Sequence, residues 1–350
     1  MTDLSDPRAF LLSLGQAAIR AALPDRIAGH LPQVPEGRTI VVGAGKAAAS
    51  MASAFEKLWP APLEGTVVTR YGHAVPCSRI EVLEASHPVP DAAGVTATRR
   101  ILSRLDGLTE KDLVVALISG GGSALLALPG GDLTLEDLKA VNSALLASGA
   151  DITAMNCVRK HVSAIAGGRL AAAAHPARLV TIAISDVPGD DPAVIASGPT
   201  VPDPTTRQEA LAIIARYRMD LPAAVMRHLA TDACESVKPD HAAFAGGSDV
   251  RLVARPVESL RAAQRIADAA GLRTLVLGDT IEGEARDVAQ VHAALARSVL
   301  EHDLPFAPPL LILSGGETTV TLPKDPPIGR GGRNSEFALA FAVARTPGVT

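Results

Sequence analysis

One continuous apolar run, Leu113-Val-Val-Ala-Leu-Ile118, constrains the fold of this chain most strongly. A strand with one solvated face alternates polar and apolar residues, whereas an unbroken apolar run is typical of a strand buried on both faces of a parallel sheet. The run leads into Ser119-Gly-Gly-Gly-Ser123 and a short predicted helix. The order of strand, glycine turn and helix therefore predicts an α/β fold.

The same order occurs earlier, where a β-branched run at residues 39–42 leads into Gly43-Ala-Gly-Lys46 and a predicted helix. Such a helix start directs backbone N–H groups at an anion. The spacing of Gly43, Gly45 and Ala48 also matches the dinucleotide fingerprint G-x-G-x-x-A, and Arg70 ends the next strand where NADP could bind. A reductase is therefore one interpretation, although Lys46 favours phosphoryl transfer, which benefits from a cation at this position.

A second concentration of glycine and charge lies near the C-terminus. Ile312-Leu-Ser-Gly-Gly-Glu317 reads as a strand and tight turn, and Gly329-Arg-Gly-Gly-Arg-Asn334 follows it. The glycines allow close approach of backbone to a ligand, and the guanidinium groups suit phosphate or carboxylate. We expect a site for a small anionic substrate here, with a solvated Arg–Glu pair on a hairpin rim as the alternative.

Two further strand ends carry candidate residues. His87 lies in Ser86-His-Pro-Val-Pro-Asp91, after a predicted strand at residues 80–83, and is either a site residue or a hydrogen-bonded turn histidine. Asp186 and Asp190 follow a predicted strand at residues 179–184. Because Mg²⁺ is often held by one or two carboxylates, these two acids are candidate metal ligands.

The length of 350 residues suggests two domains. We place them at residues 1–235 and 236–350, because a polar stretch at residues 231–240 precedes a predicted strand at residues 242–245. On the predicted helix at residues 151–166, Asn156 and Lys160 share one face. A solvated basic face is the favoured interpretation of this pair, and a binding site is the alternative.

Composition excludes several classes of protein. A net charge of −4 and 3% aromatic residues argue against nucleic-acid binding. No apolar run approaches the roughly 18 residues of a membrane span, and the first residues do not resemble a signal peptide. The three cysteines have neither metal-site nor disulfide spacing, so we expect a reducing, cytoplasmic location.

Several motifs occur here in the order found in one family. They are Gly43-Ala-Gly-Lys46, Ser86-His-Pro-Val-Pro-Asp91, Ser119-Gly-Gly-Gly-Ser-Ala-Leu-Leu126, Ile184-Ser-Asp-Val-Pro-Gly-Asp190, Ser197-Gly-Pro-Thr200, Ser314-Gly-Gly-Glu-Thr-Thr319 and Gly331-Gly-Arg-Asn334. Over nearly its whole length the chain resembles glycerate 2-kinases with a C-terminal MOFRL domain, whose members have often been labelled hydroxypyruvate reductase. The resemblance implies a larger Rossmann-like α/β/α sandwich with a mostly parallel sheet, a smaller C-terminal α/β domain, and an active site in the cleft between them.

The resemblance also implies an activity, the ATP-dependent phosphorylation of D-glycerate to 2-phosphoglycerate with Mg²⁺. Lys46 and Arg333 match the family's proposed catalytic cations, and Arg330 is a close competitor of Arg333. Glu317 would orient the substrate hydroxyl, with His87 as another candidate base. The predicted substrate-binding residues are Arg330, His87, Asn334 and Ser119, and the predicted phosphate- or nucleotide-binding residues are Gly43, Gly45, Gly120, Gly121, Gly122, Ser123, Gly315 and Gly316.

The family pattern continues beyond Pro347-Gly-Val-Thr350 into a further strand and a Gly-Thr-Asp-Gly loop, so we expect an incomplete C-terminal domain. The expected partners are D-glycerate and ATP, and the sequence leaves a homodimer open. Two alternatives stand beside the kinase. One is an NADP-dependent hydroxypyruvate reductase, and the other is a non-catalytic protein that binds a sugar acid.

Overall fold

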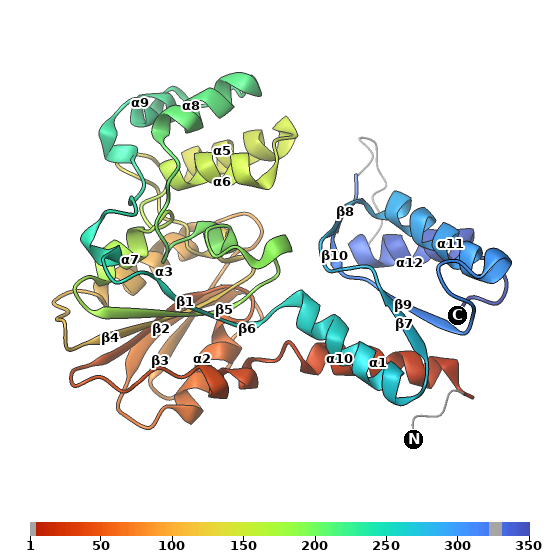
Figure 1. Cartoon of the computed structure of the whole chain (residues 1–350). Coiled ribbons are helices and arrows are strands. Elements are labelled where there is room, and N and C mark those ends of the chain that lie inside the picture. Colours follow the sequence, from red (N-terminus) through yellow and green to blue (C-terminus); the bar gives the residue numbers. More distant parts are fainter. Residues whose placement is uncertain (1–4, 322–330) are drawn as a thin grey trace. The chain divides into compact units, whose positions relative to one another are not determined.

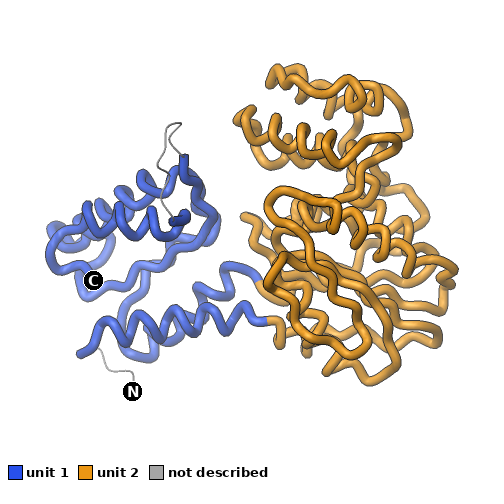
Figure 2. The backbone as a smooth tube through the Cα atoms, turned by 180° about the vertical axis from the view of Figure 1, so that it is seen from behind, with its two compact units in different colours: residues 1–23, 255–350 blue, residues 24–254 orange. Residues whose placement is uncertain are grey.

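The structure is a computed structural model that describes residues 5–321 and 331–350. The chain forms two compact units, coloured separately in Figure 2. Unit 1 consists of Met1–Leu23 and Arg255–Thr350, and unit 2 consists of Pro24–Ala254. Unit 2 is thus one continuous segment of chain that interrupts unit 1.

Unit 2 contains a six-stranded sheet in which all neighbouring strands are parallel (Figure 1). The strand order is β3-β2-β1-β4-β5-β6. The strands are β1 (Thr39–Ala44), β2 (Glu64–Arg70), β3 (Ile80–Ala85), β4 (Leu113–Ser119), β5 (Arg178–Ile184) and β6 (Asp249–Ala254). Strand β4 is buried along its whole length, which confirms the prediction from the apolar run. The order reverses between β1 and β4, and ligands of open α/β sheets bind at such a switch point.

Helices cover both faces of this sheet (Figure 1). On one face, α2 (Ala48–Leu58) packs through Met51 and Phe55 against Val41 and Val115. On the other, α3 (Ala92–Ser103) and α7 (Arg169–Ala174) pack against Ile40 and Val42. Successive residues of β1 therefore belong to opposite cores, which is why its sequence carries no polar alternation.

A second group of helices shares a separate apolar core within unit 2. These helices are α5 (Leu135–Ser148), α6 (Ile152–His161), α8 (Arg207–Arg216) and α9 (Ala223–Leu229). The remaining helical segments of the unit are short: η1 (Pro24–His30), α4 (Gly122–Leu125), η2 (Pro188–Asp190), η3 (Ile195–Ser197), η4 (Asp232–Cys234) and η5 (Ala242–Phe244).

The units divide the chain at Ala254 and Arg255, whereas the sequence led us to expect a boundary between residues 235 and 236. The strand expected at residues 242–245 is wrong, because this segment holds the 3-10 helix η5. The strand that follows, β6, pairs with β5 and completes the sheet of unit 2. The polar stretch that suggested a linker therefore lies inside a unit.

Unit 1 begins with α1 (Pro7–Arg20), which packs on α10 (Pro256–Ala269) although the whole of unit 2 separates them in sequence. Phe10 and Leu14 of α1 share a core with Ala263 and Ala267 of α10. This apolar contact, invisible in the local sequence, is why the first helix belongs with the C-terminal part of the chain.

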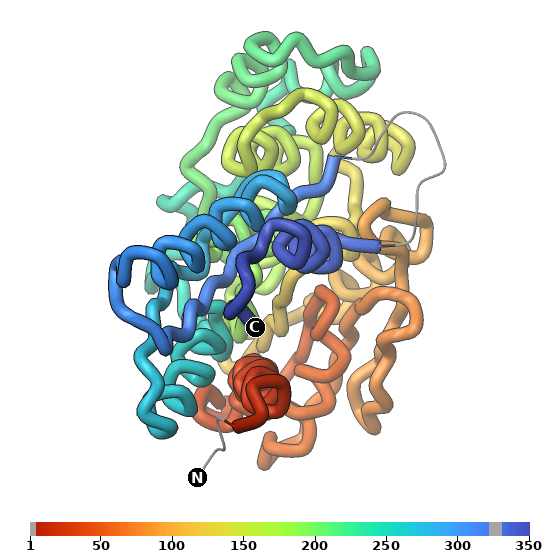
Figure 3. Tube along the Cα trace, turned by 90° about the vertical axis from the view of Figure 1, so that its right-hand side faces the viewer, coloured from red at the N-terminus to blue at the C-terminus, as the bar shows by residue number. Residues whose placement is uncertain are grey.

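The rest of unit 1 contains two parallel strand pairs, β7 with β9 and β8 with β10. Its elements are β7 (Arg273–Val276), β8 (Ile281–Glu284), α11 (Ala285–His302), β9 (Leu310–Leu313), β10 (Gly316–Thr319) and α12 (Arg333–Ala344). Helices α11 and α12 lie side by side, as Figures 1 and 3 show. Among residues 5–321 and 331–350, no helix is long and apolar enough to cross a membrane.

The interpretation of Asn156 and Lys160 as a solvated basic face is wrong. Their side chains lie in the interior of unit 2, with residues only 3% and 6% exposed. Lys160 Nζ lies 3.2 Å from Oδ1 of buried Asp203. Burial would raise the pKa of Asp203, but the charge of Lys160 and the hydroxyl of Thr205 lower it, and the net pKa lies below its ordinary value. Helix spacing could not reveal this partner, because it comes from a loop 43 residues away.

Replacing Lys160 with Met should destabilise the protein by about 3 to 5 kcal/mol, because Asp203 would be left as an unpaired buried charge. Adding Asp203→Leu should restore most of this loss. Urea unfolding would measure both effects.

The control is Lys139→Met, which removes an exposed pair with Glu136 and should cost less than about 1 kcal/mol. A Lys160→Met protein as stable as this control would show that Asp203 does not depend on its lysine.

Candidate functional site

The loops that follow β1 and β4 are hydrogen bonded to each other at the switch point of the sheet. Lys46 donates its backbone N–H to the carbonyl of Gly120 at 2.8 Å. The backbone N–H of Ala47 donates to Oγ of Ser119 at 3.0 Å. The predicted site residues Lys46, Ser119 and Gly120 therefore lie together, although 72 or more residues separate the two loops.

Asp186, at the end of β5, joins these two loops. Its Oδ2 lies 3.2 Å from Nζ of Lys46, and the two side chains are 45% and 43% exposed. A Cβ at Gly120 would overlap the Asp186 carboxylate, so only glycine permits this approach. Because an exposed ion pair contributes at most about 1 kcal/mol, either partner can exchange the other for a ligand at little cost.

His87 lies against the glycine loop after β4. A Cβ at Gly121, where φ is +81°, would lie 2.8 Å from the His87 ring. Burial lowers the pKa of His87, and the positive charges of Lys46 and Arg70 lower it further against the opposing charge of Asp186. The imidazole is therefore neutral near pH 7 and can accept a proton.

The glycine loop after β4 offers unused backbone donors. Among residues 5–321 and 331–350, the N–H groups of Gly121, Gly122 and Ser123 have no hydrogen-bond acceptor. Ser119 accepts from Ala47, which leaves its own hydroxyl proton free to donate. Free N–H groups on successive residues of a turn are the kind of backbone donors that bind anions.

Gly43 and Gly45 have a packing role that is independent of any ligand. A Cβ on Gly43 would overlap the backbone of Leu117 in β4, and one on Gly45 would overlap Ser119. Both glycines thus allow the β1 loop to lie directly against β4. A contact of either residue with a nucleotide stays a prediction.

The two candidate metal ligands lie in the loop after β5. Asp186 is half-exposed, and Oδ1 of Asp190 is buried without a hydrogen-bond partner in the part of the chain that the structure describes. Within that part there is no group of three or more His, Cys, Asp or Glu residues able to hold a metal ion. Mg²⁺ bound with a nucleotide needs only one or two protein carboxylates, so this donor set fits such an ion.

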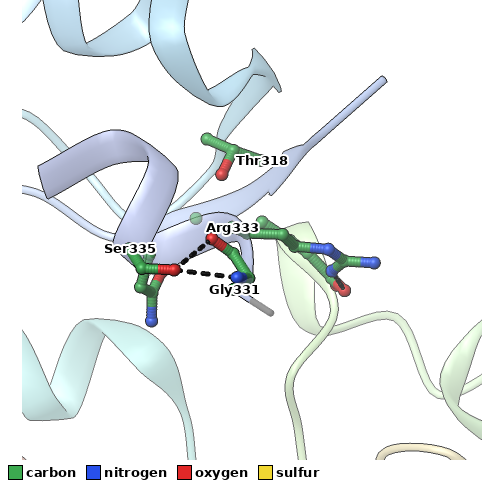
Figure 4. Close-up of a pocket in the computed structure, with 8 residues that line it drawn as sticks. Thr318, Gly331, Arg333 and Ser335 are labelled. Atoms are coloured by element: carbon green, nitrogen blue, oxygen red, sulfur yellow. Dashed lines mark hydrogen bonds and ion pairs between the residues drawn. The ribbon is translucent and has the colours of Figure 1, made fainter. Parts of the chain in front are cut away.

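In unit 1, the predicted residues Gly316, Glu317, Arg333 and Asn334 line a pocket of about 690 Å³ (Figure 4). Its lining residues are Gly316, Glu317, Thr318, Gly331, Gly332, Arg333, Asn334 and Ser335. Arg333 forms an ion pair with Glu317, and its side chain extends away from Ser335 in Figure 4. Both partners are about half exposed, so the guanidinium is accessible to an anion. Arg330 lies outside the described residues.

The Ser-Gly-Gly turn of unit 1 differs from the glycine loop of unit 2. Nδ1 of His292 lies 2.8 Å from Val288 O, and because a carbonyl oxygen can only accept, Nδ1 carries the proton and donates it. In the neutral ring, Nε2 then accepts the hydroxyl proton of Ser314 at 2.9 Å. The N–H of Gly315 donates to Gly278 O at 2.9 Å. Two donors of this turn are therefore already used.

A Cβ on Gly316 would overlap the backbone of Ile281, so this glycine is required by the pairing of β10 with β8. Phosphate binding by Gly315 and Gly316 stays a prediction that this geometry does not favour. Sequence reasoning missed His292, because a single histidine in an amphipathic helix carries no signal of its partner.

Models of two protein families match the chain. Residues 10–230 match a domain of unknown function, DUF4147, and residues 310–350 match the MOFRL family. A D-glycerate 2-kinase of Thermotoga maritima is 36% identical over 347 residues, which cover 98% of this chain and 81% of the relative. A glycerate 2-kinase of Pyrococcus horikoshii is 37% identical, and the match covers 96% of this chain and 79% of the relative.

A protein of Agrobacterium vitis that is provisionally named hydroxypyruvate reductase is 55% identical over 96% of this chain and 76% of its own length. Among solved structures, a glycerate kinase from Thermotoga maritima superposes with a TM-score of 0.83 at 36% identity. That match covers 96% of this chain and 79% of the other.

Proposed function

Because the chain belongs to the glycerate 2-kinase family, in which a DUF4147 domain precedes a MOFRL domain, we propose that it transfers the γ-phosphoryl group of ATP to the 2-hydroxyl of D-glycerate. The product is 2-phosphoglycerate. The observation that carries the proposal is Lys46, held at the switch point of the sheet beside the free N–H donors of Gly121, Gly122 and Ser123.

This geometry supports a kinase over a reductase. A phosphoryl group in transfer carries negative charge on its equatorial oxygens, and cations and N–H donors stabilise that charge. Lys46 offers a mobile cation, and the loop offers several donors beside it. Hydride transfer to a nicotinamide needs neither, so the reductase name of some relatives does not explain this set of residues.

Each candidate site residue of unit 2 has a defined role in the proposal. Lys46 would leave Asp186 and neutralise the transferring phosphoryl group, and the glycine loop would bind phosphate oxygens through its N–H groups. His87, neutral near pH 7, would accept the proton of the attacking hydroxyl. Glu317 is the second candidate for this step, but its carboxylate is already paired with Arg333.

Mg²⁺ supplies further neutralisation of phosphate charge when it is bound with ATP. Asp186 and Asp190 would hold it: Asp186 can exchange its exposed pairing with Lys46 for the cation, and Oδ1 of Asp190 has no hydrogen-bond partner in the described ranges.

In unit 1, Arg333 would stabilise the transition state, and its planar fork of donors suits phosphoryl oxygens. Arg330 would hold the glycerate carboxylate, with Asn334 and Ser119 as further substrate contacts.

The three cysteines are free thiols, as a reducing cytoplasm would keep them.

One assay compares the two activities directly. We expect ATP-dependent formation of phosphoglycerate from D-glycerate and no NADPH oxidation with hydroxypyruvate. In parallel, ATP with Mg²⁺ should raise the melting temperature, because a ligand that binds only the folded state stabilises it. NADPH oxidation without phosphate-ester formation would assign the protein to the reductases, and tight glycerate binding without any turnover would assign it to the binding proteins.

Lys46→Met should lower kcat by about 100- to 1000-fold, because it removes a cation that acts mainly in the transition state. Folding should be unchanged, since the exposed pair with Asp186 contributes little. Lys57→Met, at an exposed position of the helix α2 that follows Lys46, is the matched control. Normal turnover of the Lys46 variant would reduce this residue to a surface lysine.

Arg333→Lys keeps the positive charge but loses the bidentate fork, so we expect it to be nearly as impaired in kcat as Arg333→Ala. Loss of a transition-state contact lowers kcat and kcat/KM together and leaves the KM for ATP nearly unchanged. Arg345→Lys, at the end of the same helix, is the control. If Arg333→Lys matches the parent enzyme in steady-state kinetics, charge alone matters at this position.

A further inference from the structure

A series of hydrogen bonds runs from the glycine loop into the interior of unit 2, through side chains to which the proposed function gives no role. The Oγ atoms of exposed Ser123 and buried Ser197 lie 2.9 Å apart. Ser197 Oγ in turn donates to Oδ1 of Asn156 at 3.2 Å. Asn156 is 3% exposed, so the series ends on a side chain that no solvent reaches.

The direction of these hydrogen bonds follows from Asn156, the last residue of the series. The amide oxygen of Asn156 can only accept, so the single hydroxyl proton of Ser197 is committed to it. The contact between the two serines then requires that Ser123 donates its proton to Ser197. Ser123 therefore has no proton left for a ligand, and its Oγ presents only lone pairs to the site.

The backbone of Ser197 has a conformation that is unfavourable for serine. Ala196 and Ser197 have φ values of +52° and +61°, a left-handed conformation that non-glycine residues rarely adopt. Ala196 is fixed by packing, because a Cβ on Gly122 would lie only 2.5 Å from the Ala196 Cβ. Strained residues of this kind persist where the surrounding structure fixes them, and they cluster at functional sites.

The amide of Asn156 gives a second, independent indication. Its Nδ2 atom is buried and has no hydrogen-bond partner among the described residues. An unsatisfied buried donor is unfavourable, and a smaller or apolar residue would avoid it. What the asparagine provides at this position is the accepting oxygen that Ser197 uses.

We propose that Asn156 and Ser197 are positioning residues that fix the Ser123 hydroxyl as a hydrogen-bond acceptor for a hydroxyl group of the sugar-acid substrate. The inference rests on the glycerate kinase function proposed above. The N–H groups of the same loop donate to negatively charged oxygens. The lone pairs of Ser123 Oγ repel such oxygens and accept a hydrogen bond from an alcohol. The loop can thereby recognise an anionic group and a neighbouring hydroxyl together.

The test compares Ser197→Ala, Ser123→Ala and the double variant in steady-state kinetics. Alanine tolerates the left-handed backbone here, as Ala196 does. Each single variant should raise the KM for D-glycerate by about 3- to 10-fold, the usual effect of one lost neutral hydrogen bond. The double variant should be no worse than either single one, because both act through one hydroxyl. The KM for ATP should change by less than about twofold.

Asn156→Asp tests the direction of these hydrogen bonds, because it retains an accepting oxygen and removes the amide donor, with a buried negative charge as its cost. Its KM for D-glycerate should match that of the parent. Ser103→Ala, whose exposed hydroxyl bonds only Arg100 O, is the serine control.

A parent protein without kinase turnover would overturn the proposed function and this inference with it. With an active parent, three results overturn the inference alone: additive effects of the two serine variants, an equal rise in the KM for ATP, or a folded Asn156→Asp protein as impaired as Ser197→Ala. If Asn156→Asp fails to fold, the serine variants still test the inference, because their effects on the KM for D-glycerate either add in the double variant or do not.

Discussion

Two hydrogen bonds between neighbouring loops organise the candidate site. Lys46 and Ala47, at the start of α2, donate their backbone N–H groups to Gly120 and Ser119 after β4. Backbone groups that bond each other are not available to a ligand, so these contacts decide which donors stay free. The free donors are the N–H groups of Gly121, Gly122 and Ser123, which follow Gly120. The same contacts hold the Lys46 side chain beside Asp186.

The sequence predicts those parts of the site that depend on local order. The apolar run of β4 predicts a buried parallel strand, which is found, whereas anion binding by the glycines after it stays a prediction. The buried pair of Lys160 and Asp203 was not predictable, since a lysine one turn from a polar residue resembles a solvated face until its partner is known. Strand β6 was missed for a similar reason, because its place in the sheet depends on pairing with β5.

Similar sequence does not guarantee similar hydrogen bonding. Ser-Gly-Gly occurs at the end of a strand in both units, and the sequence predicts the same anion-binding role for both turns. In unit 1 the donors of Ser314 and Gly315 already bond His292 and Gly278, whereas those of Gly121 and Gly122 in unit 2 have no acceptor among the described residues. The difference arises from His292 of α11 and from Gly278, two neighbours that the motif does not contain.

The interruption of unit 1 by unit 2 has a consequence for synthesis on the ribosome. Helix α1 is made before its partner α10, which ends at Ala269. At 5 to 20 residues per second, the intervening chain takes about 10 to 50 seconds to emerge. During that time Phe10 and Leu14 have no native partner on α10, while unit 2 can already fold. Until α10 emerges, a nascent chain of this protein therefore carries an apolar helix without its partner, the kind of segment that a ribosome-associated chaperone would shield.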